Sequence, residues 1–133
     1  MLQLGQWVQI DKSPTYGADY FDNDYINTQD WIVSIHMKDG HYVYELFSED
    51  EDCLWVANEL TGTDTFEDIN EPSLDIGDEV YKDGDTQDIH TITAIAVDGD
   101  DFIFNINQGL WYGEWELTLF RKKDGAHPDY TLF

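Results

Sequence analysis

The chain contains one short motif twice, and this repeat constrains its fold more than any other feature. Residues 54–61 read LWVANELT, and residues 110–118 read LWYGEWELT, with one residue more before Glu-Leu-Thr. Upstream of each copy a glycine is followed three residues later by valine, beginning at Gly5 and at Gly77. Self-similarity on this scale marks repeated structural units. The sequence therefore predicts two similar small domains in tandem.

Alternating apolar residues in both halves are typical of half-buried β-strands. At 31–38 one expected face carries Trp31, Val33, Ile35 and Met37, and the other carries Ser34, His36 and Lys38. At 114–119 the expected buried face carries Trp115, Leu117 and Leu119. Asp39-Gly40 follows the first of these runs and is a strong hairpin signal. We therefore expect an all-β protein.

The 133 residues divide into halves near the lower size limit for independent folding. We expect a first domain over 1–62, a linker over 63–73 and a second domain over 74–133, packed together. The first domain has a long loop at 11–30, which mixes aromatic and acidic residues. The basic tail that begins at Arg121 is compatible with fraying and with packing through Tyr130, Leu132 and Phe133.

Short strands, the Gly-x-x-Val opening, the long first loop and a Trp shortly before Glu-Leu resemble SH3-like barrels of the Tudor and KOW type. The resemblance implies two SH3-like barrels in tandem. In such barrels the long first loop forms part of the ligand surface, which would implicate Tyr16, Tyr20, Phe21 and Tyr25 here. Nucleic-acid-binding members use basic loops, and this chain departs from them in charge.

The net charge of the chain restricts its partners. Asp and Glu number 29 against 6 Lys and Arg, for a formal net charge of -23. Such self-repulsion opposes compaction. Direct binding to nucleic acid or to an anionic membrane is excluded on this ground, whereas a basic protein surface would be attracted.

Carboxylates are most concentrated between Glu45 and Asp88, where sixteen stand against one cation, Lys82. One turn of duplex DNA displays about twenty phosphates over about 34 Å, so the two densities are of the same order. In charge, though not in any motif, the segment resembles the acidic DNA-mimic inhibitors of phages. Solubility or salt adaptation would explain the same composition. The residues expected to contact a basic partner are Glu49, Asp50, Glu51, Asp52, Asp64, Glu67, Asp68, Glu71, Asp75, Asp78, Glu79, Asp83, Asp85 and Asp88.

Other kinds of site have weaker support in the sequence. The acidic turns at 83–88 and 98–101 offer oxygen ligands, but neither completes an EF-hand loop, so weak calcium binding is an alternative only. The four histidines show no paired zinc spacing. Recognisable catalytic motifs are missing. We therefore expect a binding protein without a metal or cofactor rather than an enzyme.

Two features bear on the cellular location. The lone Cys53 excludes an intramolecular disulfide, and we expect it to be a buried thiol. The N-terminus lacks a signal-peptide pattern, and no apolar run approaches the roughly 20 residues of a membrane span. We expect a cytoplasmic protein.

Overall fold

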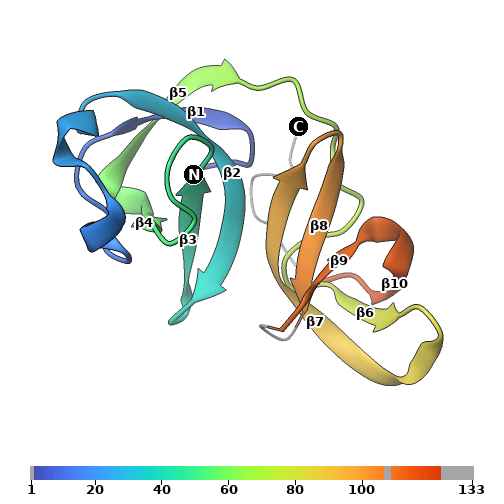
Figure 1. Ribbon diagram of the computed structural model, residues 1–133. Helices are drawn as coiled ribbons and strands as arrows, with labels where there is room; N and C mark the ends of the chain where they lie inside the picture. The colour runs from blue at the N-terminus through green and yellow to red at the C-terminus, as the bar shows by residue number, and fades with distance from the viewer. Residues whose placement is uncertain (1, 107–108, 124–133) are drawn as a thin grey trace. The chain divides into compact units, whose positions relative to one another are not determined.

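The computed structural model describes residues 2–106 and 109–123, and in them the protein is all-β (Figure 1). The chain divides into two compact units, an N-terminal unit over Met1–Ile69 and a C-terminal unit over Asn70–Phe133. The tail residues Tyr130, Leu132 and Phe133 lie outside the described residues, so both expectations for the tail stay predictions.

The N-terminal unit is built from antiparallel strands in the spatial order β5-β1-β2-β3-β4. These strands are β1 (Gln6–Ile10), β2 (Gln29–Lys38), β3 (His41–Leu46), β4 (Trp55–Val56) and β5 (Leu60–Phe66). A 3-10 turn, η3 (Ala57–Glu59), joins β4 to β5. The segment between β1 and β2 holds two further 3-10 turns, η1 (Ala18–Tyr20) and η2 (Asn23–Tyr25).

The C-terminal unit repeats this order as β10-β6-β7-β8-β9, again antiparallel. Its strands are β6 (Glu79–Lys82), β7 (Asp85–Asp98), β8 (Asp101–Ile106), β9 (Trp111–Gly113) and β10 (Leu117–Arg121). The 3-10 turn η4 (Glu114–Glu116) joins β9 to β10. Only Asp83 and Gly84 separate β6 from β7, so this unit has a tight hairpin where the other has a long loop.

The repeated Gly-x-x-Val opening has the same structural role in both units. Gly5 and Gly77 have φ angles of 84° and 95°, a backbone conformation that favours glycine. Their N–H groups donate to Ile32 O at 2.8 Å and to Ile92 O at 2.9 Å. The valines that follow, Val8 and Val80, are fully buried. The glycine therefore allows the chain to turn into its first strand, and the valine begins the core.

The Glu of each Glu-Leu-Thr closes the 3-10 turn before the last strand. Glu59 Oε1 accepts from Val56 N at 2.9 Å, and Glu116 Oε1 accepts from Gly113 N at 3.0 Å. This shared bond satisfies a backbone donor at the turn and explains why the motif recurs.

The two Leu-Trp pairs of the motif are not structurally equivalent. Trp55 pairs with Tyr44 on β3, and Tyr112 pairs with Phe104 on β8. Trp55 is fully buried, whereas Trp111 is exposed. An alignment on Leu-Trp is therefore one residue out of register, and an alignment on Glu-Leu-Thr is correct.

A bulge in β2 overturns the predicted alternation of its faces. The register with β3 shifts between Ile32 and Ser34, and both residues are fully buried while Val33 is only half-buried. One extra residue in a strand moves the following side chains to the other face. The prediction that Val33 shares a face with Ile35 is wrong for this reason, and β7 carries the matching bulge between Ile92 and Ala94.

The predicted strand face at 114–119 is also wrong. Residues 114–116 form η4, and Trp115 is 71% exposed. A 3-10 turn has three residues per turn, so the period-two argument does not apply there. Leu117 begins β10 and is buried as expected, but Leu119 is exposed.

Apolar side chains from β1, β2, β3 and β4 fill the core of the N-terminal unit, and those from β6, β7 and β8 fill the core of the other. The largest of them are Ile10, Ile32, Ile35, Tyr44, Leu46, Trp55, Ile92, Ile95 and Phe104. Strand β5 extends to Phe66, so residues 63–66 of the expected linker are strand instead.

Candidate functional site

The aromatic residues of the long loop between β1 and β2 have different structural roles. Phe21 is buried, and its ring meets the ring of Trp55 edge-on at a centroid distance of 5.4 Å. Phe21 is therefore part of the core, and its expected role at a ligand surface is wrong. Tyr20 and Tyr25 are 63% and 49% exposed and remain accessible.

Tyr16 anchors this loop to the unit. Its backbone pairs with Leu54 in both directions, with N···O distances of 3.1 and 3.0 Å. Its hydroxyl donates to Asp39 Oδ2 at 2.8 Å, and this hydrogen bond raises the pKa of Tyr16. Lys38 Nζ lies 5.0 Å from the centroid of the Tyr16 ring. Tyr16 therefore already has a cation and a carboxylate beside it.

Four consecutive carboxylates form an acidic loop, residues 49–52, which follows β3, and all of them except the half-buried Glu49 are exposed. Among the described residues none of the four forms an ion pair with a Lys, Arg or His side chain. Burial and the charges of Asp30 and Asp22 raise the pKa of Glu49. The acidic loop thus carries uncompensated negative charge.

Asp30 holds the residue that precedes this loop by a hydrogen bond. It is buried, and its carboxylate accepts from Trp31 N and from Ser48 N, each at 2.8 Å. Burial raises the pKa of Asp30, although these hydrogen bonds act in the opposite direction. Asp30 therefore positions the start of the acidic loop.

Cys53 ends the acidic loop as a buried thiol, as expected from the sequence. Its Sγ donates to Gly17 O at 3.4 Å. Burial, followed by the charges of Asp50, Glu49 and Asp52, raises the pKa of Cys53 to about 11.

We expect the native Cys53 thiol to react with iodoacetamide at pH 8 about a hundredfold more slowly than an unperturbed thiol, since only the thiolate is nucleophilic. Mass spectrometry of timed, quenched samples gives the rate, and the protein unfolded in urea is the control. Equal rates for native and unfolded protein would contradict the buried position of the thiol.

Two of the predicted partner contacts in the C-terminal unit are buried instead. Asp75 and Asp78 lie in the segment before β6, and Asp78 is fully buried. Asp78 Oδ2 accepts from Lys122 Nζ at 3.0 Å and from Asp75 N at 2.9 Å. Asp78 Oδ1 accepts from Lys123 N at 2.9 Å. A contact with a partner is wrong for both carboxylates, because they hold the two ends of the unit together.

The other predicted acidic contacts differ in exposure. Glu79 is half-buried and pairs with Arg121, whose Nε lies 2.6 Å from Glu79 Oε1. Glu67 is half-buried and accepts from Trp7 Nε1 at 2.8 Å. Asp85 is half-buried, and the exposed ones are Asp64, Asp68, Glu71, Asp83 and Asp88.

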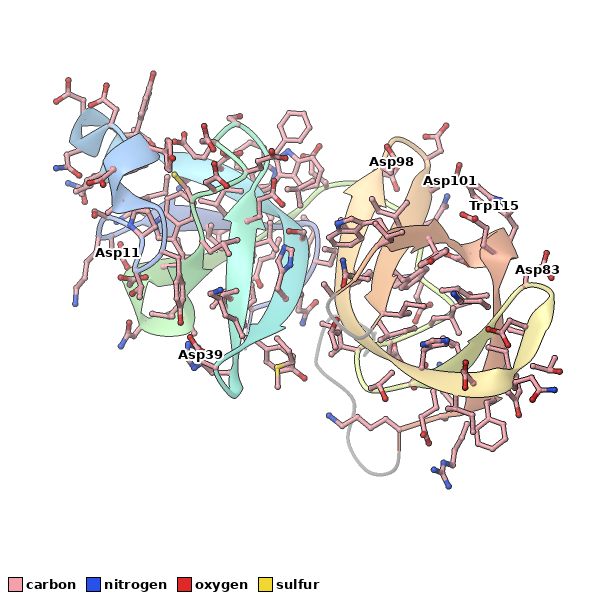
Figure 2. All side chains as sticks on the ribbon, turned by 60° about the horizontal axis from the view of Figure 1, so that its bottom comes forward. Asp11, Asp39, Asp83, Asp98, Asp101 and Trp115 are labelled. Atoms are coloured by element: carbon pink, nitrogen blue, oxygen red, sulfur yellow. The ribbon has the colours of Figure 1, made fainter. Side chains whose placement is uncertain are left out.

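A surface pocket in the C-terminal unit brings carboxylates and an exposed indole together. Its volume is about 350 Å³, and it lies where the β7–β8 turn meets η4 and the segment before β6. Its lining residues are Asn70, Glu71, Asp100, Asp101, Phe102, Glu114 and Trp115, and we call it the Trp115 pocket. Figure 2 shows Asp101 and Trp115 at the same end of this unit.

Local contacts hold the walls of the Trp115 pocket in place. Ser73 Oγ donates to Glu114 Oε2 at 2.7 Å. A Cβ on Gly113 would come within 2.5 Å of Cη2 and Cζ3 of Trp115, so the indole lies directly against this glycine. Asn70 Nδ2 donates to Asp100 O at 3.4 Å. These contacts join residues of the C-terminal unit to one another, so they fix the walls of the pocket within that unit.

Of this pocket, the sequence placed only Glu71 among the partner contacts, and it assigned Asp100 and Asp101 to a weak calcium alternative. An alignment on Glu-Leu-Thr would have indicated more, because it sets Gly113, Glu114 and Trp115 against 56–58 of the first copy, where the sequence is Val-Ala-Asn. At these positions the C-terminal unit carries an acidic and an aromatic side chain that the shared framework does not require.

The structure gives little support for a metal site or for a catalytic serine. Within residues 2–106 and 109–123, no group of three or more His, Cys, Asp or Glu side chains could hold a metal ion. Ser34 Oγ lies 2.7 Å from His36 Nε2, but it donates to Glu45 Oε1 at 2.7 Å and is fully buried. A nucleophilic serine must instead donate to its base and reach substrate.

None of the helices in the described part of the chain is long and apolar enough to cross a membrane. In comparisons with known proteins, no family model, no curated protein and no solved structure matches this chain.

Proposed function

We propose that the protein is a non-enzymatic acidic binding protein that docks on a basic surface of a nucleic-acid-binding protein, as a DNA-mimic inhibitor or adaptor. The supporting observation is a folded β-framework that displays carboxylates in its turns without Lys, Arg or His partners among the described residues. The acidic loop is the example in the N-terminal unit, and the Trp115 pocket is the example in the C-terminal unit.

The framework supports two SH3-like barrels as the finer fold assignment. In both units the strand order places the last strand beside the first, and a 3-10 turn links the fourth strand to the fifth. Short bent strands joined in this way are what the resemblance to Tudor- and KOW-type barrels implies. We propose that the charge, rather than a basic loop, then decides the class of partner.

The test is affinity capture by the tagged full chain from host lysate at low salt, followed by stepwise salt elution. We expect a nucleic-acid-binding protein that elutes as salt rises and that duplex DNA displaces. The physical reason is screening, because the Debye length falls from about 10 Å at 0.1 M salt to about 3 Å at 1 M. Affinity of the purified pair that is unchanged between these salt concentrations would overturn the proposal.

A peptide-binding module of the Tudor or SH3-like type is the second candidate, and the exposure of Tyr20 and Tyr25 favours it. The double variant Y20A/Y25A separates the two, with Asp50→Asn/Asp52→Asn as its counterpart in the acidic loop. Loss of binding in the tyrosine variant alone, with capture that persists at high salt, would assign function to the long loop instead.

A further inference from the structure

We propose that the Trp115 pocket binds the side chain of a single arginine presented by the basic partner. The inference deepens the proposed function and rests on it for the origin of the arginine. It depends on the pocket and its indole rather than on acidity alone, because carboxylates occur throughout this chain.

The indole of Trp115 is exposed at this pocket. An indole that is 71% exposed leaves a large apolar ring in water, on a residue type that usually contributes buried area. Phe102 forms an apolar wall of the same pocket and is itself buried. A planar group that stacks on the indole would remove this ring from water.

The Trp115 pocket is strongly acidic. Four carboxylates line the pocket, those of Glu71, Asp100, Asp101 and Glu114, and no Lys or Arg of the described residues lines it. A cation is therefore the complementary ligand. A guanidinium is planar, stacks on aromatic faces and offers paired N–H donors to carboxylates, which an ammonium does not.

Another pocket of the same unit, of about 280 Å³, is lined by Lys82, Asp83, Gly84, Asp85, Tyr112 and Glu116. There the chain supplies its own cation, since Lys82 Nζ lies 6.0 Å from the centroid of the Tyr112 ring. Lys38 and Tyr16 make the same kind of contact in the N-terminal unit. The Trp115 pocket also combines an aromatic ring with carboxylates, but no Lys or Arg of the described residues lines it.

The repeated framework does not need the side chains of Glu114 and Trp115. The N-terminal unit makes the corresponding 3-10 turn with Ala57 and Asn58 where the C-terminal unit has Glu114 and Trp115. Across the β7–β8 turn, Asp98 pairs with Asp101, whereas Lys38 pairs with His41 at the equivalent place. Both changes add an acidic or aromatic side chain at one end of the C-terminal unit.

The size of the pocket fits one side chain. Its volume of about 350 Å³ is at the lower end of the roughly 300–1,000 Å³ that small-ligand sites occupy. We therefore expect weak binding of an isolated arginine and a larger contribution when a folded partner presents it.

The test titrates the full chain, labelled with ¹⁵N, with the capped peptide Gly-Gly-Arg-Gly-Gly and follows the indole N–H signal of Trp115 by NMR. The W115A variant, whose mutated side chain is largely exposed, identifies that signal. We expect a saturable shift with the arginine peptide and at least fivefold weaker binding when citrulline, the uncharged isostere, replaces arginine. Equal binding of both peptides, or no saturable shift, would overturn the proposal.

Two further comparisons sharpen the result. E114Q should weaken binding at least threefold, while D19N, which removes one exposed charge that does not line the pocket, should leave it unchanged. G113A should also weaken binding, because the added methyl displaces the indole. Equal losses in E114Q and D19N would show that a diffuse field binds the peptide and would overturn the pocket, and equal binding of the matching lysine peptide would overturn the assignment to arginine.

The peptide titration and the lysate capture can fail separately. Arginine-peptide binding without any DNA-displaceable partner would keep the pocket and reject the proposed function. A salt-sensitive partner whose affinity W115A leaves unchanged would keep the proposed function and reject the pocket.

Discussion

Replacement of Asp78 by Ala should lower the free energy of unfolding of the C-terminal unit by about 3 kcal/mol, because removing one member of a buried charged group leaves its partners unsatisfied. The N–H groups of Asp75 and Lys123 would lose their acceptor, and Lys122 Nζ would keep only Ser73 O and Asp75 Oδ2. The value lies at the low end for buried pairs since the Lys122 side chain is 45% exposed and can turn to water.

The matched control for Asp78 is its neighbour Glu79. Glu79 pairs with Arg121, whose side chain is 64% exposed, and exposed pairs contribute at most about 1 kcal/mol. Urea unfolding of D78A and E79A, followed by amide signals of β7 and β10, gives both values. A midpoint for D78A no lower than that of E79A would show that the buried network does not hold this unit together.

The pKa of Lys122 provides independent evidence that this buried network stabilises the fold. Burial lowers the pKa of Lys122, but the hydrogen bond to Asp78 and the charges of Asp75 and Asp78 outweigh burial and raise it. A lysine pKa raised by folding stabilises the protein below the unfolded pKa of about 10.4. This contribution is lost as the pH rises through the folded pKa, and D78A should remove most of it.

Replacement of Gly17 by Ala should destabilise the N-terminal unit by about 3 kcal/mol or more. Gly17 has φ of 75°, where an L-residue costs roughly 1–2 kcal/mol. An added Cβ would lie 2.6 Å from the carbonyl carbon of Asp52 and closer still to its oxygen. The backbone at Asp52 cannot shift easily, because the nearby Leu54 is hydrogen-bonded to Tyr16 through both its N–H and its C=O. Overpacking of this kind adds about 1–3 kcal/mol.

Gly40 provides the control for Gly17 in the same unit. Its φ is 83°, but nothing lies within 4 Å of an added Cβ, so G40A should cost only about 1–2 kcal/mol. Thermal unfolding gives both values, and iodoacetamide modification of Cys53 should accelerate in G17A only, since Cys53 donates to Gly17. Equal destabilisation and unchanged thiol reactivity in the two variants would contradict the close approach of the loops.

The repeat in the sequence carried most of the information on architecture. The repeat reflects two local requirements of the backbone. One is a glycine with positive φ before the first strand, and the other is a Glu that closes the 3-10 turn. Both requirements recur wherever the same turn is built. The all-β class followed from alternation, and the buried thiol of Cys53 followed from its residue type.

The sequence could not reveal which aromatic and acidic residues are used inside the fold. Phe21 and Tyr20 are adjacent in the same loop, yet Phe21 packs on Trp55 and Tyr20 faces water. In the sequence, Asp75 and Asp78 resemble every other acidic residue. Only the fold places Lys122, more than forty positions later, beside them. Burial and pairing of this kind are long-range properties, so composition does not contain them.

The acidic charge and the all-β repeat were therefore determined by the sequence itself, since both depend on residue type and local spacing. The tertiary structure decided where that charge is accessible. A bulge shifted the faces of β2, a 3-10 turn exposed Trp115, and the meeting of η4 with the β7–β8 turn formed its pocket. Each of these depends on contacts between residues distant in sequence, which no local pattern encodes.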